Sequence, residues 1–277
     1  MEGFLLLIQK KLNMKNFIAI LSFGIVMTSC SKNEVKNVNV SKESDSVQAP
    51  KQFVIDSVRV QDSLVINKNL TTSFNKQLLV FPSIENKVIL DSIYKEALVE
   101  TKVYDANSLK ADLTKQMQKS FTKTKTDSDK WSPEFKQTWD DTSAMKVVSN
   151  QNNVLTIKYS GSGFAGGAHG YYFESYKVFD LNKNIVINQN DIFKDPKDPA
   201  WDALLKSHFD EPEQKNMLLE DKIHLNNNFF FDQDKITFVY NQYEITAYAA
   251  GVVHITFKFS EIKNFLKPEF VSQYKVK

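Results

Sequence analysis

Cysteine is almost absent from this chain of 277 residues, in which Cys30 is the only one. A single cysteine cannot form an intramolecular disulfide, and it cannot build a thiolate-rich zinc site. An excess of one charge is lacking as well, because 35 basic and 33 acidic residues leave a net charge of +2. Without a basic stripe there is no electrostatic footprint for nucleic acid, and we expect no nucleic-acid partner.

Histidine is also scarce, and the four histidines, His169, His208, His224 and His254, are scattered along the chain. No two of them have the HxH or HxxxH spacing that brings two ligands to one metal ion. Metal binding and nucleophilic catalysis both need a constellation of partners, and the sequence shows none. We therefore expect no metal site, no cofactor and no catalytic residue.

The N-terminal residues have the order of a secretory signal. Lys15 precedes an apolar run at residues 17–27, and two small residues separate that run from Cys30. The run is too short to span a bilayer comfortably. Residues 1–30 resemble a bacterial lipoprotein signal peptide, in which Cys30 becomes the lipidated first residue of the mature protein.

This resemblance implies export and attachment to a membrane through the lipid on Cys30. Residues 31–51 carry no periodic apolar face, so we expect them to form a disordered tether. Ser31 is not the aspartate that retains lipoproteins in the inner membrane of enterobacteria, which favours the outer membrane. The alternatives are an uncleaved membrane anchor or a chance cysteine, and the remainder would be exported in either case.

Glycine is concentrated in one place. The chain has eight glycines, and five of them lie between Gly161 and Gly170. Glycine is needed where the backbone adopts a positive φ or where another group approaches the main chain closely. We therefore expect a constrained loop there, and a partner for it in the tyrosine-rich segment from Tyr240 to Gly251.

Hydrophobic periodicity predicts an α+β fold in two domains, residues 52–170 and 171–277. Ser83 and Asn107 are residue types that begin helices. In the first domain we expect strands at 52–60, 63–66, 74–81, 144–148 and 153–159, and two helices that begin at Ser83 and Asn107.

The second domain should continue an antiparallel meander. Its expected elements are strands at 171–179, 236–240 and 252–259, a helix after Asp198 and Pro199, and a short helix at 214–219. In the last strand, Val253, Ile255 and Phe257 alternate with polar residues, which predicts one buried face. Ser260 should begin a closing helix that Pro268 stops.

Several motifs carry a resemblance to a known family. They are Gly166-Gly-Ala-His-Gly170, Phe179-Asp-Leu181, Asp191-Ile-Phe193, the run from Phe231 to Ile236, and Tyr243-Glu-Ile-Thr-Ala-Tyr-Ala-Ala-Gly251. Together they resemble the paired extracytoplasmic domains of RsiV anti-sigma factors and of the N-terminal region of PdaC-type peptidoglycan deacetylases. The resemblance covers residues 53–266. It implies a small α+β domain followed by an antiparallel-sheet α+β domain similar to a subdomain of the Hsp70 ATPase.

Neither function of these relatives transfers whole. PdaC-type proteins use a separate metal-dependent deacetylase domain, whose ligand motifs this sequence lacks. RsiV proteins bind a sigma factor through a cytoplasmic segment, for which few residues are available before the signal sequence. The exported module remains, and in RsiV it recognises lysozyme. The resemblance therefore implies a non-catalytic module that binds a lysozyme-like protein or peptidoglycan.

The candidate ligand-binding residues belong to the glycine-rich loop and the tyrosine-rich segment, because exposed aromatic side chains beside a rigid loop are good binding anchors. They are Gly166, Gly167, His169, Tyr171, Tyr243, Glu244 and Tyr248. Two other functions stay open: an envelope enzyme that processes glycans or peptides with Glu244 or His169, and a structural or assembly lipoprotein.

Overall fold

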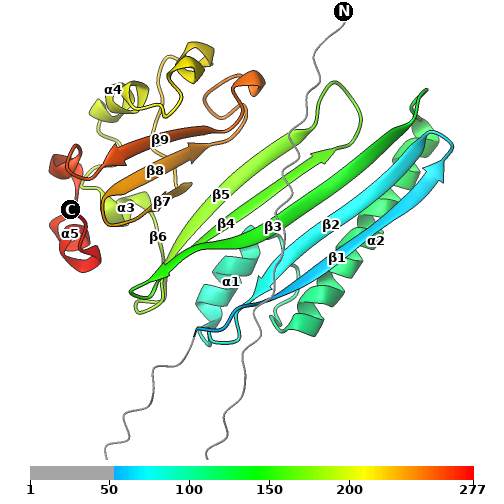
Figure 1. Ribbon diagram of the computed structural model, residues 1–277, viewed down its shortest axis with the longest axis horizontal. Helices are drawn as coiled ribbons and strands as arrows, with labels where there is room; N and C mark the ends of the chain where they lie inside the picture. The colour runs from blue at the N-terminus through cyan, green and yellow to red at the C-terminus, as the bar shows by residue number, and fades with distance from the viewer. Residues whose placement is uncertain (1–52) are drawn as a thin grey trace, which may run out of the picture. The chain divides into compact units, whose positions relative to one another are not determined.

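The structure is a computed structural model that describes residues 53–277. The expected signal peptide, the lipidation of Cys30 and the tether at residues 31–51 lie outside the described residues. The described residues all belong to one compact unit. That unit has the expected α+β fold, with a large sheet, a small sheet and several helices (Figure 1). Within it, no helix is long and apolar enough to span a bilayer.

The large sheet has six strands in chain order, β1 to β6. Its strands are β1 (Asp56–Asn67), β2 (Leu70–Val80), β3 (Gln137–Gln151), β4 (Val154–Phe164), β5 (Tyr171–Asp180) and β6 (Ile185–Ile187). Neighbouring strands are antiparallel except for β2 and β3, which run parallel. The parallel pair follows from the connection, because two helices between β2 and β3 carry the chain back to the start of the sheet.

These two helices are α1 (Lys87–Glu96) and α2 (Ala106–Lys130). The expected starts at Ser83 and Asn107 were wrong. Asn86 caps α1 by accepting from the Ile89 amide, and Asp105 caps α2 by accepting from the Ser108 amide. The Ser83 hydroxyl is engaged elsewhere, in hydrogen bonds with the backbone of Val54.

The helices cover one face of the sheet. Alternate residues of β4 point to that face, among them Leu155 and Ile157, and they pack with Ile93 of α1 and Leu109 of α2 in one hydrophobic cluster. Because side chains alternate along a strand, the neighbours of these residues point to the other face. Val154, on that opposite face, packs against the C-terminal part of the chain.

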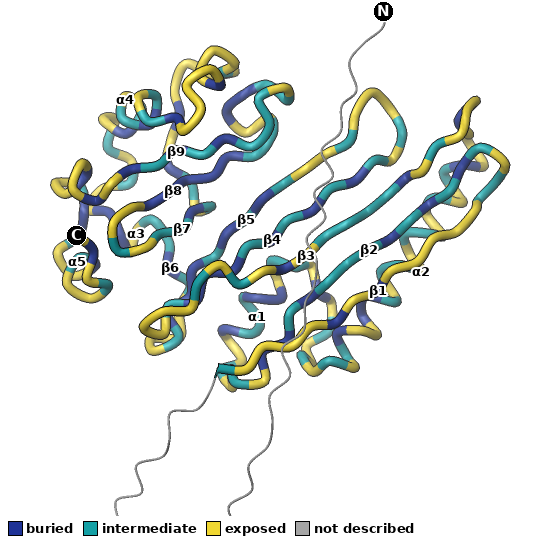
Figure 2. The backbone as a smooth tube through the Cα atoms, viewed as in Figure 1, coloured by how far each residue is buried: buried dark blue, intermediate teal, exposed yellow. Residues whose placement is uncertain are grey.

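The C-terminal part contains a small antiparallel sheet with the order β7, β8, β9. Its elements are α3 (Gln189–Ile192), α4 (Ala200–Ser207), the 3-10 helix η1 (Pro212–Met217), β7 (Phe229–Phe231), β8 (Lys235–Tyr240), the 3-10 helix η2 (Tyr248–Ala250), β9 (Val253–Lys258), the 3-10 helix η3 (Lys263–Phe265) and α5 (Pro268–Tyr274). The expected half-buried strand is confirmed, since Val253, Ile255 and Phe257 of β9 are fully buried. Figure 2 shows the buried stretches of β8 and β9.

Two expected helices in this part differ from the structure. The segment expected as a helix at 214–219 forms the 3-10 helix η1 instead. Pro268 does not stop a helix that begins at Ser260. It occupies the first turn of α5, where its missing N–H costs nothing and its fixed φ suits a helix.

The junction between β5 and the C-terminal part is polar. The side chain of Asn241 accepts from the Glu174 amide at 2.8 Å and donates to the Glu174 carbonyl at 3.1 Å. Asn228 repeats this arrangement, accepting from the Tyr176 amide at 2.7 Å and donating to the Glu174 carbonyl at 2.8 Å. These two carboxamides thus satisfy the open backbone edge of β5 as a neighbouring strand would.

The expected domain boundary after Gly170 falls in the loop that joins β4 to β5. Both strands pair in the same sheet, over ten residue pairs from Val154 with Asp180 to Gly163 with Tyr171. Residues 171–180 therefore complete the large sheet, and the C-terminal part docks on them through Asn228 and Asn241.

Candidate functional site

The glycines of β4 lie beneath aromatic side chains of β5. Gly161 pairs with Phe173, and Gly163 pairs with Tyr171. A Cβ atom at Gly161 would lie 2.6 Å from the Phe173 ring, and one at Gly163 would lie 2.7 Å from the Tyr171 ring. Each would also lie within 2.7 Å of a backbone carbonyl oxygen of β3. The glycines are therefore required by close approach, from a ring on one side and from the backbone on the other.

The tip of the β4–β5 loop has a different requirement. Gly166 and Gly167 have φ values of 84° and 92°, in the region that favours glycine. A Cβ atom at Gly166 would lie 3.0 Å from the ring of Trp139, which stacks on Trp131 at 6.0 Å between ring centroids. At Gly167 there is open space. Of the two reasons expected for a glycine, the positive φ holds at Gly167, and no described residue lies within 4 Å of the added Cβ atom.

His169 follows the loop tip and meets the tyrosine-rich segment. Its ring stacks on Tyr248 at 3.9 Å between centroids, and its Nε2 lies 3.3 Å from the Tyr243 hydroxyl. Its Nδ1 lies 2.8 Å from the Gly170 carbonyl oxygen, which can only accept, so Nδ1 carries a hydrogen; in the neutral ring Nε2 then accepts from Tyr243. We call His169, Tyr243 and Tyr248 the aromatic platform.

The two expected segments thus lie side by side (Figure 1). A further contact joins them, because the Tyr172 amide donates to the Gln242 side chain at 3.1 Å. Tyr243 has a φ of 65° and is 58% exposed, so its ring is presented to solvent by a tight turn. A side chain held in an uncommon backbone conformation and left exposed is a candidate for ligand contact.

Tyr171 belongs to a neighbouring polar cluster. It is 49% exposed, and its hydroxyl contacts the carboxylate of Asp141 at 3.5 Å. Asp141 also forms an ion pair with Lys76 at 2.9 Å. Partial burial raises the pKa of Tyr171 to about 12, and the negative charge of Asp141 adds to the effect. The Tyr171 hydroxyl therefore stays protonated at neutral pH and can serve as a hydrogen-bond donor.

Glu244 is the remaining candidate, and its hydrogen-bond partner differs from those of His169. Its carboxylate accepts from the amide of Asn241 and so closes its own turn. Partial burial of the carboxylate raises the pKa of Glu244, and the hydrogen bond from Asn241 opposes this only in part. Within the described residues, no hydrogen bond joins Glu244 to His169. The two residues thus have separate hydrogen-bond partners.

Glu174 is a buried carboxylate that the sequence reasoning missed. Its Oε1 accepts from Lys158 at 2.6 Å and from the Tyr172 hydroxyl, and its Oε2 accepts from Tyr176 at 2.9 Å. His254 of β9 lies 3.6 Å from the same carboxylate. The available signal was the spacing of Tyr172, Glu174 and Tyr176, which places all three on one face of a strand.

The electrostatics of Glu174 follow from these partners. Burial raises its pKa, but the hydrogen bonds from Lys158, Tyr172 and Tyr176 outweigh burial and leave the pKa below its ordinary value. The pKa of Tyr172 rises to about 12, through partial burial first and the hydrogen bond to Glu174 second. Glu174 is thus held as a charged, fully engaged group that ties β5 to β4 and to β9.

Two of the other histidines have neighbours outside the platform. The Nδ1 atom of His208 contacts the Leu204 carbonyl oxygen at 3.0 Å, and His254 faces Glu174. Among residues 53–277, no group of three or more histidine, cysteine, aspartate or glutamate residues is placed to hold a metal ion. What the site offers chemically is a rigid set of rings for stacking, with the Tyr171 hydroxyl nearby as a donor.

Comparisons with known proteins connect this fold to described relatives. The model of DUF3298, a family described as a protein of unknown function, matches residues 190–260. The peptidoglycan-N-acetylmuramic acid deacetylase PdaC of Bacillus subtilis is 23% identical over 141 residues, which cover 48% of this chain and 30% of PdaC. The chain thus spans under a third of the length of this relative. The expected similarity to PdaC is confirmed, and the similarity to RsiV stays a prediction.

Solved structures agree with the fold. A DUF3298 family member from Bacteroides fragilis matches with a TM-score of 0.66 at 20% identity, over 81% of this chain and 98% of that one. A DUF3298 family protein from Pseudomonas aeruginosa matches with a TM-score of 0.51 at 16% identity, over 78% of this chain and 95% of that one. At these identities the likeness concerns the fold alone.

Proposed function

We propose that this protein is a non-catalytic recognition module of the cell envelope that binds peptidoglycan through the aromatic platform. The observation that carries the proposal is the rigid stack of His169 and Tyr248 with the exposed ring of Tyr243 beside it. Aromatic rings fixed on a rigid scaffold lose little entropy on binding and offer flat apolar faces. The sugar rings of a glycan strand present matching apolar faces.

The relatives support the same ligand. PdaC is by name a peptidoglycan-N-acetylmuramic acid deacetylase, and the similarity to it covers about half of this chain. A module that is attached to an enzyme acting on peptidoglycan is well placed to bind peptidoglycan.

Attachment to a membrane is part of the proposal. A lipid on Cys30 would tether the module within reach of the cell wall, in the outer membrane if Ser31 acts as the sorting residue. Replacing Cys30 by serine should move the protein from the membrane fraction to the soluble fraction. A Cys30→Ser protein that stays in membranes would refute the lipid anchor.

The ligand is tested by mixing the full-length protein with insoluble peptidoglycan and, separately, with lysozyme. Cosedimentation with peptidoglycan without release of fragments or acetate is the expected result. A complex with lysozyme and none with peptidoglycan would replace the ligand by a lysozyme-like protein. Turnover of the peptidoglycan that a His169→Ala or Glu244→Gln variant abolishes would establish an enzyme instead.

A further inference from the structure

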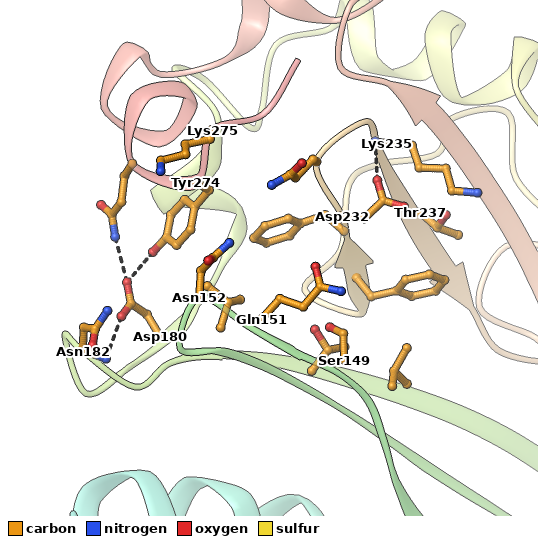
Figure 3. A pocket seen from close by; sticks show the side chains of 17 residues that line it. Ser149, Gln151, Asn152, Asp180, Asn182, Asp232, Lys235, Thr237, Tyr274 and Lys275 are labelled. Carbon is orange, nitrogen blue, oxygen red and sulfur yellow. Dashed lines mark hydrogen bonds between the residues drawn. The ribbon is translucent and has the colours of Figure 1, made fainter. Parts of the chain in front are cut away.

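A cavity of about 490 Å³ lies between the large sheet and the C-terminal part. One wall comes from the β3–β4 turn and the start of β4, and the other comes from β7, β8 and α5 (Figure 3). Its volume falls within the range of about 300–1,000 Å³ that is typical of small-molecule sites. Val154 at this cavity and Phe164 at the platform loop mark the two ends of β4, about 33 Å apart at roughly 3.3 Å per residue.

The mouth of the cavity is preorganised. Asn152 and Asn153 join β3 to β4 with φ values of 54° and 61°, the conformation of a two-residue hairpin turn that matches the twist of the strands. Figure 3 shows Gln151 and Asn152 on this turn and Tyr274 on the other side of the space. The side chains that meet a ligand there are carried by a tight hairpin and by a helix.

Uncharged polar groups dominate the lining. Two acidic residues, Asp180 and Asp232, are balanced by Lys235 and Lys275. The carboxamides are Gln151, Asn152, Asn182, Gln233 and Gln273. A balanced lining of this kind selects neither an anion nor a cation, and carboxamides both donate to and accept from neutral polar ligands.

The carboxylate of Asp180, at one wall of the cavity, already accepts four hydrogen bonds from the protein. One carboxylate oxygen accepts from the amides of Asn182 and Lys183 at 3.0 and 2.9 Å. The other accepts from Gln273 and from the Tyr274 hydroxyl, each at 2.7 Å. This buried carboxylate therefore fixes α5 against the β5–β6 turn and leaves no open acceptor for a ligand cation.

Other lining groups are open. Within the described residues, no hydrogen bond engages the side chains of Gln151, Asn152 or Gln233. Thr156 is only 1% exposed, and its hydroxyl has no hydrogen-bond partner in residues 53–277. A buried hydroxyl without a partner is costly, and this one belongs to a residue that lines the cavity.

The apolar part of the lining is aromatic. Phe230, Phe231 and Tyr274 are half-buried and contribute to the cavity together with Val154. The lining combines aromatic surface, carboxamide side chains without hydrogen-bond partners, and equal numbers of acidic and basic residues. We therefore propose that this cavity is a second binding site, for a neutral saccharide. Rings pack against the sugar face, while Gln151 and Gln233 bind its hydroxyl or acetamide groups.

The inference stands apart from the aromatic platform, because no platform residue lines the cavity. It is tested by calorimetric titration of the full-length protein with N,N′-diacetylchitobiose. We expect the double variant Gln151→Ala, Gln233→Ala to bind at least about tenfold more weakly, the factor for two lost neutral hydrogen bonds. The platform variant Tyr243→Ala should retain binding at this site.

Three results would overturn the proposal: no binding to the unchanged protein, equal binding to the double variant, or loss of binding in Tyr243→Ala alone. The last result would move the saccharide to the platform and leave the proposed function intact. Amide chemical shifts give a check that needs no variant. Those of Asn152 and Gln233 should move on titration, and unchanged shifts would contradict the site.

Discussion

The Nε2 atom of His169 lies 3.3 Å from the hydroxyl of Tyr243, although 74 positions separate the two residues in the sequence. The other ring nitrogen is held by the Gly170 carbonyl oxygen at 2.8 Å, so the imidazole is fixed on both sides. A ring fixed in this way serves as a support for Tyr243 and a surface for stacking. The relationship ties the glycine-rich loop to the tyrosine-rich turn and gives the platform its rigidity.

Substitutions of the glycines should lower the free energy of unfolding by different amounts. Gly163→Ala places a Cβ atom 2.6 Å from the Asp140 carbonyl oxygen, so two strands must separate, and we expect a loss of about 3 kcal/mol in the free energy of unfolding. Gly167→Ala meets only the positive φ and should cost about 1 kcal/mol. His169→Ala, on the surface, should cost under about 1 kcal/mol. Urea denaturation measures all three, and a reversed order of Gly163 and Gly167 would contradict the geometry.

Glu174 and Glu244 should give opposite pH dependences. The folded pKa of Glu174 lies below its ordinary value, so its contribution is complete above that value and is lost as the pH falls through the folded pKa. The folded pKa of Glu244 is raised, so its contribution is present at low pH and is lost as the pH rises through that pKa.

The measurement is the free energy of unfolding between pH 3 and 7 for the unchanged protein and for Glu174→Gln and Glu244→Gln. The difference between the unchanged protein and Glu174→Gln should grow with pH, and the corresponding difference for Glu244→Gln should shrink. Parallel curves for the two variants would show that the carboxylates sit in equivalent environments, against the structure.

Thr156→Val should leave the ligand-free protein as stable as before or more stable by about 1 kcal/mol, because it removes a buried hydroxyl that has no partner. Thr142→Val is the matched control. The Thr142 hydroxyl donates to the Ser162 carbonyl at 3.1 Å and contacts the Ser162 hydroxyl at 2.8 Å, so its loss should destabilise by about 1 kcal/mol. Thermal unfolding of both variants checks the contrast, and a large loss in Thr156→Val would mean that the hydroxyl is engaged.

Much of the fold could be read from local pattern. The alternation along β9 predicted its buried face, and the concentration of glycine predicted the constrained β4–β5 loop, because both signals act within a few residues. Helix starts were harder. Ser83 is a good capping residue, but tertiary contact with Val54 takes its hydroxyl, and Asn86 caps α1 instead.

Features that depend on contacts between distant parts of the chain could not be predicted from local sequence patterns. Pro268 can follow one helix or begin another, and only packing decides between these positions. The split after Gly170 overlooked that Asn228 and Asn241 complete the edge of β5 from the C-terminal part. Glu174 is surrounded by partners from three strands, which no single stretch of sequence displays.

The central claim is that the exposed ring of Tyr243 on the aromatic platform binds peptidoglycan. The direct measurement is the affinity of the full-length protein for insoluble peptidoglycan, compared between the unchanged protein, Tyr243→Ala and the control Val65→Ala, which alters an exposed apolar residue on β1. We predict a loss of at least about tenfold for Tyr243→Ala, the size expected for one aromatic anchor, and no change for Val65→Ala. Equal affinity for all three proteins would contradict the account.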